Sequence, residues 1–459
     1  MFRRILLLLL VGAVCLTGCG CDYINTSLDT LITPPSMNEQ QAEILKALDA
    51  SLQKDETITL EYPENGNYRS AVIIYDIDEE PTDEAIVFYN SSVESTLGET
   101  GLRICLLDQF EDGWRAIWNL PGPGEDVDKV LFFTDNQTGE KFVIIGFSTE
   151  KQMQKSYMIY RYKDGVFEQV YTAPYQMLEV FDITNDGIDD IITIAYKEEP
   201  KNKNTVQTDS PQQTNAYVVN YQNGVFTLID QTQMAGKAVN YNNVVKDRTS
   251  FGKPALFLDE QISKSTYATE ILTCENGHLK NLIVHDDVNL FEQTLRTQVP
   301  ISYDFNKDSI TEIPCTEFFP GYSEMSENPL YLTKWYQLHD NVLVQTGISY
   351  VNYSQGFGFL LPDDWEGKVS AKQTVQDDEV TFFLFDGLIE DDSQKILSIR
   401  TDTLNNIRTN GVPDGYFEIM TIGQVVYLAK QHVDKTNPFY LSNREIQDRF
   451  VEMHVSLQQ

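Results

Sequence analysis

The stretch FDITNDGIDDIITIA, residues 181–195, carries the pattern from which the fold can be predicted. An aromatic residue comes first, acids or amides follow at alternate positions, and a glycine leads into an apolar run rich in isoleucine. β-Branched residues favour strands, whereas Asp, Asn and Gly favour turns. The stretch therefore predicts a tight polar loop that leads directly into a buried strand.

Two more stretches can be aligned with this one: YDIDEEPTDEAIVFY, residues 75–89, and YDFNKDSITEIPCTE, residues 303–317. Weaker copies occur at residues 132–147 and 247–254. Hairpin signals alternate with these copies, and four of the five are the Asp-Gly or Asn-Gly pairs that two-residue hairpins prefer. The five turn pairs are Asp112-Gly113, Asp164-Gly165, Asn223-Gly224, Asn276-Gly277 and Asp340-Asn341. The repeat is roughly 55 residues long and holds about four short strands, which is the size of a propeller blade.

The three loop stretches resemble the FG-GAP or VCBS-type repeats of β-propellers. The resemblance covers residues 57–350 and implies a mainly β protein whose propeller has five visible blade-like repeats. A β-sandwich or a solenoid built from the same short strands is the alternative.

Helical patterns flank the repeats on both sides. Ser36 and Glu39 form a capping-box pattern that predicts an amphipathic helix within residues 37–56. Residues 351–459 break the repeat and predict a small C-terminal α+β domain. Its last helix should begin at Ser442 and carry Ile446, Phe450 and Met453 on one face. Within it, residues 356–365 are similar to a segment of clostridial-type surface lipoproteins, which implies no activity.

The N-terminus resembles the signal peptide of a bacterial lipoprotein. Arg3 and Arg4 precede an apolar run that is too short to span a bilayer, and Leu16-Thr17-Gly18-Cys19 follows. The resemblance implies that residues 1–18 are removed and that Cys19 carries the lipid, with palmitate among its acyl chains. Residues 19–36 would then form a tether. We expect an extracytoplasmic protein that is lipid-anchored to the bacterial cell membrane at the cell surface.

The net charge of the chain is −35. Such a surface repels phosphate backbones, so nucleic acid is excluded as a partner. It also repels anionic headgroups, so a lipid on Cys19, rather than a basic patch, would hold the protein at the membrane.

The acidic loops are candidate calcium sites, because calcium takes six to eight oxygen ligands and a short loop can supply several of them. In the loop of residues 182–190 the candidate ligands are Asp182, Thr184, Asp186, the carbonyl of Ile188, and Asp190. The other two loops offer Asp304, Asn306, Asp308 and Glu312, and Asp76, Asp78, Glu80 and Glu84. Such residues also cap turns without any metal, and that alternative stays open. A bound ion would have a structural role.

No nucleophile elbow, P-loop or H-E-x-x-H motif occurs in the sequence. The leading hypothesis is therefore a non-enzymatic module that binds a protein or a glycan through its propeller. The alternative is an envelope glycan-processing enzyme that uses carboxylates in a propeller cleft.

Overall fold

The computed structural model describes residues 38–453, except for residues 79, 94–100, 150–154, 164, 198–212, 286, 298–299, 375–377 and 388–393. Within these ranges the chain is mainly β, as predicted, and its strands form several antiparallel sheets. The signal stretch, Cys19 and the whole of the predicted tether lie outside the described residues.

Four sheets follow one another in chain order between residues 58 and 281. The first contains β1 (Ile58–Leu60), β2 (Val72–Tyr75), β3 (Glu84–Ser91), β4 (Leu102–Phe110) and β5 (Gly113–Pro121). The second contains β6 (Asp126–Thr134), β7 (Lys141–Ser148), β8 (Lys155–Lys163) and β9 (Val166–Tyr175). The third contains β10 (Met177–Phe181), β11 (Asp190–Tyr196), β12 (Thr214–Gln222) and β13 (Val225–Gln233). The fourth contains β14 (Asn240–Arg248), β15 (Pro254–Ser263), β16 (Thr266–Glu275) and β17 (His278–Asn281).

Two further large sheets complete the chain. A short ribbon of β18 (Val284–His285) and β19 (Val288–Asn289), and the 3₁₀ helix η1 (Phe291–Thr294), come before them. The fifth sheet contains β20 (Ile313–Phe318), β21 (Tyr331–His339), β22 (Val342–Asn352), β23 (Phe357–Leu361) and β29 (Phe450–Glu452). The sixth contains β24 (Val369–Thr374), β25 (Glu379–Leu384), β26 (Lys395–Thr403), β28 (Val425–Gln431) and β27 (Phe417–Ile422). The 3₁₀ helix η2 (Asp363–Trp365) connects β23 to β24, and the helix α4 (Leu404–Asn410) lies between β26 and β27.

The predicted turn pairs join consecutive strands of these sheets. Asn223-Gly224 and Asn276-Gly277 both have positive φ at each residue, as a type I′ hairpin turn requires. Asp340-Asn341 takes the same conformation between β21 and β22 although it contains no glycine. Asp164 lies outside the described residues.

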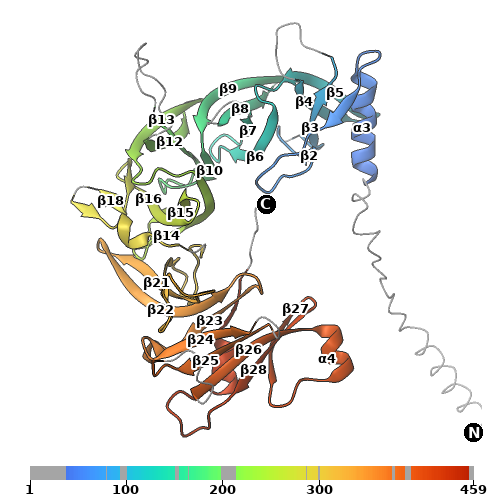
Figure 1. Cartoon of the computed structure of the whole chain (residues 1–459). Coiled ribbons are helices and arrows are strands. Elements are labelled where there is room, and N and C mark those ends of the chain that lie inside the picture. Colours follow the sequence, from blue (N-terminus) through green and yellow to red (C-terminus); the bar gives the residue numbers. More distant parts are fainter. Residues whose placement is uncertain are drawn as a thin grey trace, which may run out of the picture.

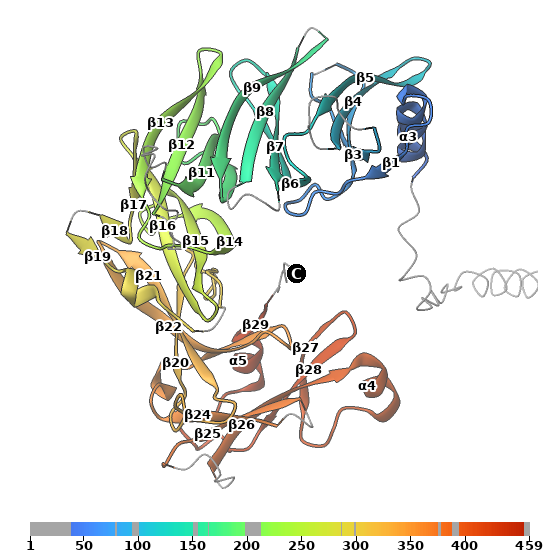
Figure 2. The ribbon, with the colours of Figure 1, turned by 45° about the horizontal axis from the view of Figure 1, so that its top comes forward.

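The sheets stack face to face along an arc, which both ribbon views show as a passage from blue to red (Figures 1 and 2). Alternate residues of one strand point to opposite faces, so a sheet with neighbours on both sides contributes to two cores. In β7, Val143 and Ile145 pack toward the first sheet, whereas Phe142 and Ile144 pack toward the third. The two ends of the arc stay apart in both views.

A helix, not a strand, covers the outer face of the first sheet. Helix α3 (Glu39–Ser51) buries Ile44 and Leu48 completely against a core that includes Val87 and Tyr89 of β3. Its capping box is formed by Asn38 and Gln41. The helix was predicted correctly, but the cap lies two residues after the predicted one, because a second pair with the same spacing satisfies the free N–H groups.

The C-terminal region shares its core with the fifth sheet. The predicted domain boundary at residue 350 falls inside β22, and β23 and β29 extend the same sheet. One apolar cluster joins Ile348 of β22 to Phe382 of β25. Ser442 caps the last helix, α5 (Asn443–Asp448), as predicted, but Phe450 and Met453 do not lie on it. Phe450 begins β29, because pairing with β23 ends the helical period there.

Candidate metal centres and a surface pocket

The three acidic loops occupy equivalent places in their sheets. The first connects β2 to β3, and the second connects β10 to β11. The third precedes β20, where Tyr303 and Glu312 form an isolated antiparallel bridge. Each loop therefore enters a buried strand, as its sequence predicts.

One hydrogen bond is repeated in all three loops. The last acid of the loop is buried and accepts the backbone N–H of the residue seven positions earlier. The three donor–acceptor pairs are Ile77 to Glu84 at 2.7 Å, Ile183 to Asp190 at 3.1 Å, and Phe305 to Glu312 at 2.8 Å. The repeated bond fixes the same loop shape three times.

The second and third loops also share their sharp turn. The carboxylate of Asp182 accepts the N–H groups of Asp186 and Gly187, at 3.1 and 3.0 Å. In the third loop Asp304 accepts the N–H groups of the two equivalent residues, Asp308 and Ser309, at 3.0 and 2.9 Å.

Among the described residues, two of these loops gather carboxylates that could hold a metal ion. Three ligand oxygens lie within 4.8 Å of one another in each cluster, and the residues are Asp76, Asp78 and Glu84 in the first loop and Asp304, Asp308 and Glu312 in the third. The loop of residues 182–190 matches the repeat pattern best, but it forms no such cluster. Its last acid is an aspartate, one methylene shorter than glutamate, and Asn220 donates to its other oxygen at 2.8 Å.

The other predicted ligands are used differently. The N–H of Glu80 donates to Asp78 at 3.1 Å, and the exposed Glu80 side chain is not part of the cluster. The amide of Asn306 donates to Asp308 at 3.1 Å, so its oxygen faces the same loop. In the second loop, Thr184 and Ile188 donate their backbone N–H groups to Asp190 and Asp186. That loop closes on itself through its own hydrogen bonds.

Burial and mutual repulsion perturb the acids that end these loops. Burial, with a contribution from Asp78, raises the pKa of Glu84 to about 8. Burial also raises the pKa of Glu312 to about 7, with Asp308 and Asp304 adding to the effect, and that of Asp190 to about 6. Glu84 is 1% exposed, and among the described residues its Oε1 atom has no hydrogen-bond partner. An unpartnered buried carboxylate oxygen is costly, which indicates that a cation would be favourable there.

A lysine reaches the first cluster from β7, and a glutamine amide reaches the third cluster from β21. The ammonium group of Lys141 lies 2.9 Å from Asp76. The amide of Gln337 donates to Asp308 at 2.8 Å and to Glu312 at 3.0 Å. The first cluster is thus partly neutralised by a charge, whereas the third is held by a neutral donor.

Replacing Ser309 with glycine should stabilise the protein. Ser309 has φ +70°, in the left-handed region where Gly187 lies in the equivalent loop. A side chain in this region costs roughly 1 kcal/mol, so we expect a gain of about 0.5–1 kcal/mol in the free energy of unfolding, measured by urea denaturation. The reciprocal Gly187→Ser variant should lose a similar amount. A loss of stability in Ser309→Gly would contradict this strain argument.

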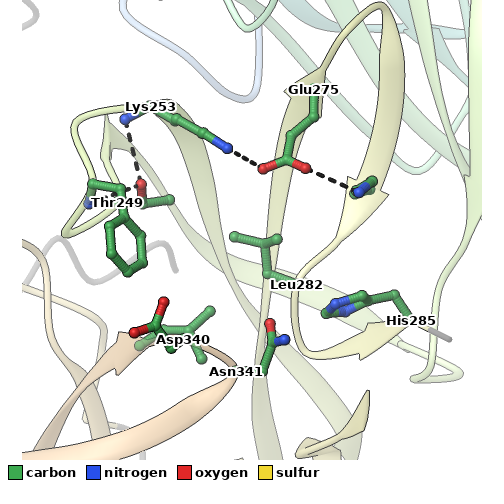
Figure 3. Close-up of a pocket in the computed structure, with 10 residues that line it drawn as sticks. Thr249, Lys253, Glu275, Leu282, His285, Asp340 and Asn341 are labelled. Carbon is green, nitrogen blue, oxygen red and sulfur yellow. Dashed lines mark hydrogen bonds and ion pairs between the residues drawn. The ribbon is translucent and has the colours of Figure 1, made fainter. Parts of the chain in front are cut away.

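A separate pocket of about 610 Å³ lies between the fourth and fifth sheets (Figure 3). It was not predicted, because its residues come from three turns that are far apart in sequence. They are Thr249, Phe251, Lys253, Glu275, Lys280, Leu282, His285, Leu338, Asp340 and Asn341. The tryptophans, by contrast, are used mostly in packing: Trp114, Trp335 and Trp365 are buried.

No family model matches the chain. No curated protein matches it significantly either. Over the part of the chain that the structure describes, no helix is both long and apolar enough to cross a membrane.

Proposed function

We propose that this chain is a lipid-anchored, extracytoplasmic binding module that has no enzymatic activity of its own. It would present an open, propeller-like arc of blades to a protein or glycan ligand. The observation that carries the proposal is the repeated unit: consecutive antiparallel sheets share cores along an arc, and acidic loops of one design enter three of them. Face-to-face sheets in radial succession are the geometry of propeller blades.

Calcium is the metal that we propose for the two carboxylate clusters. Both offer only oxygen ligands, which suit a hard cation, and extracellular modules bind calcium at roughly 10⁻⁴–10⁻³ M. Two observations support a missing positive charge: the Oε1 atom of Glu84 has no hydrogen-bond partner among the described residues, and the pKa of Glu312 is raised. Lys141 already neutralises part of the first cluster, so we expect the third loop to bind calcium more tightly.

Calcium should raise the unfolding temperature of the purified full chain, and more at pH 8 than at pH 6. Without the ion, the raised pKa values of Glu84 and Glu312 make the folded state bind more protons than the unfolded chain. Their contribution to stability is therefore present at low pH and is lost as the pH rises through about 7 to 8. Calcium replaces the protons, and at saturating concentrations it should contribute about 1–3 kcal/mol per site.

Thermal scans with calcium or a chelator, at both pH values, measure this effect. The double variant Glu84→Gln/Glu312→Gln should lose the response. Asp190→Asn is the control, because Asp190 is the equivalent acid of the second loop, which forms no carboxylate cluster. This variant should keep the calcium response. An unchanged melting temperature after chelation of the wild-type chain would overturn the calcium proposal.

The alternative function is an envelope glycan-processing enzyme that uses carboxylates. The raised pKa values of Glu84 and Glu312 are its best support. These groups belong to loops of different sheets, and each is held by a backbone N–H group of its own loop. Turnover of a cell-wall glycan by the pure protein, abolished in Glu84→Gln or Glu312→Gln, would favour the enzyme.

Replacing Cys19 with alanine should release the protein from the membrane. Without the thiol there is no attachment point for lipid. A chain that carries no acyl groups is not held at a bilayer by lipid. We expect palmitate labelling to disappear and the chain to move from the membrane fraction to the soluble fraction or the medium. Cys21→Ala is the matched control and should keep both the label and the membrane location. An unlabelled wild-type chain would contradict the anchor.

A further inference from the structure

We propose that the pocket between the fourth and fifth sheets binds a neutral sugar, through a pyranose ring placed on Phe251. The inference rests on the proposed function and names the class of ligand. A sugar ring has C–H groups on its faces and hydroxyls around its rim. It therefore needs an exposed aromatic ring surrounded by both donors and acceptors of hydrogen bonds.

Phe251 supplies the aromatic ring. Phe251 is 59% exposed although it lines a pocket, so it is accessible to a ligand. The ring of His339 lies edge-on beside it, with the centroids 6.4 Å apart. Leu282 and Leu338 add apolar surface to the same pocket.

The polar groups of the pocket balance in charge. Glu275 pairs with both Lys253 and Lys280, and these bonds lower its pKa to about 2. Asp340 lies on the opposite wall and brings the number of negative side chains in the pocket to two, equal to the number of lysines (Figure 3). Two positive and two negative groups give no preference for an ionic ligand, but they provide donors and acceptors for hydroxyls. His285 also lines the pocket.

Hydrogen bonds connect the walls of the pocket in the absence of a ligand. The hydroxyl of Ser250 donates to the carbonyl of Leu338 at 2.7 Å, which ties the β14–β15 turn to the fifth sheet. Backbone bonds from Thr249 to Lys253 and from Gly252 to Thr249 close that turn. A preorganised pocket loses less entropy on binding. Its volume of about 610 Å³ falls within the range of roughly 300–1,000 Å³ that is usual for small-molecule sites.

Saturation-transfer NMR on the purified full chain tests the inference, with cellobiose and di-N-acetylchitobiose as probes and glycerol as a polyol without a ring. We expect saturable transfer to at least one disaccharide and none to glycerol. Phe251→Ala should weaken this binding about tenfold or more, because it removes the stacking surface. Phe110→Ala removes another exposed phenylalanine, at the end of β4, and should leave the affinity unchanged.

Three results would overturn the inference. The first is no saturation transfer to either disaccharide at about 20 mM, a concentration well above a millimolar Kd. The second is undiminished disaccharide binding by a folded Phe251→Ala variant. The third is binding of a peptide that depends on Phe251 when neither disaccharide binds. None of these would refute the broader binding role. Palmitate labelling tests the anchor, and cross-linking on intact cells tests for an envelope partner.

Discussion

Replacing Leu48 with aspartate should detach helix α3 from the first sheet and strongly destabilise the N-terminal end of the arc. Leu48 is fully buried, and so is Ile44 one turn before it. The change removes an apolar contact and places an unpaired carboxylate against the core that contains Val87 and Tyr89. Large-to-small core changes cost about 2–5 kcal/mol, and an unpaired buried charge adds to this, so we expect a loss of about 4 kcal/mol or more.

Urea denaturation and limited proteolysis measure the two consequences. Leu48→Asp should lower the unfolding midpoint and make residues 39–51 sensitive to protease in the native protein. Ala42→Asp, on the exposed side of the same helix, should stay within about 0.5 kcal/mol of wild type. Equal behaviour of the two variants would mean that α3 does not cover the sheet. The expected difference matters for the fold, because α3 occupies the face where a closed ring of blades would place another sheet.

Replacing Arg296 with methionine should cost about 3–5 kcal/mol, the usual penalty for removing one partner of a buried ion pair. The Arg296 side chain is 1% exposed and lies 2.8 Å from Asp259 on β15. It also donates to Thr269 and to the carbonyls of Thr294 and Pro300. The network therefore joins the fourth sheet to the segment that leads into the fifth.

Two control variants separate this role from a general loss of charge. The double variant Arg296→Met/Asp259→Asn removes the charge that would otherwise be left alone, and it should cost less than the sum of the single changes. Arg115→Met breaks an exposed pair with Asp112 and should leave the unfolding midpoint close to that of wild type. If Arg296→Met unfolded no more easily than Arg115→Met in a denaturant titration, the joint between the two sheets would be unimportant.

Local sequence signals predicted the strands and turns well. Asn223-Gly224 is a hairpin turn because both residues tolerate positive φ, and this depends on the two residues alone. The end of the chain shows the limit. Ile446 and Phe450 have helical spacing, but Phe450 pairs with Phe359 on β23, almost a hundred residues earlier. Such a tertiary contact outweighs the helical spacing of the apolar residues, and that spacing alone does not reveal the contact.

The site was predicted in part, for a similar reason. The acidic loops were located from their spacing, and the structure places all three at the entrance to a strand. The third loop gathers carboxylates and the second does not. Glu312 is one methylene longer than Asp190, the equivalent acid of the second loop, and Asn220 donates a hydrogen bond to Asp190. The pocket around Phe251 had no sequence signal, because strands β14 to β22 bring its residues together only after folding.

The most direct test of the proposed function is cross-linking of the full chain on intact cells with an amine reagent that cannot cross membranes. A lipid-anchored binding module outside the cytoplasm should react without lysis and form a discrete adduct, and the Cys19→Ala variant should lose that adduct from the membrane fraction. A chain that stays unmodified until the cells are broken would contradict the proposed location and role.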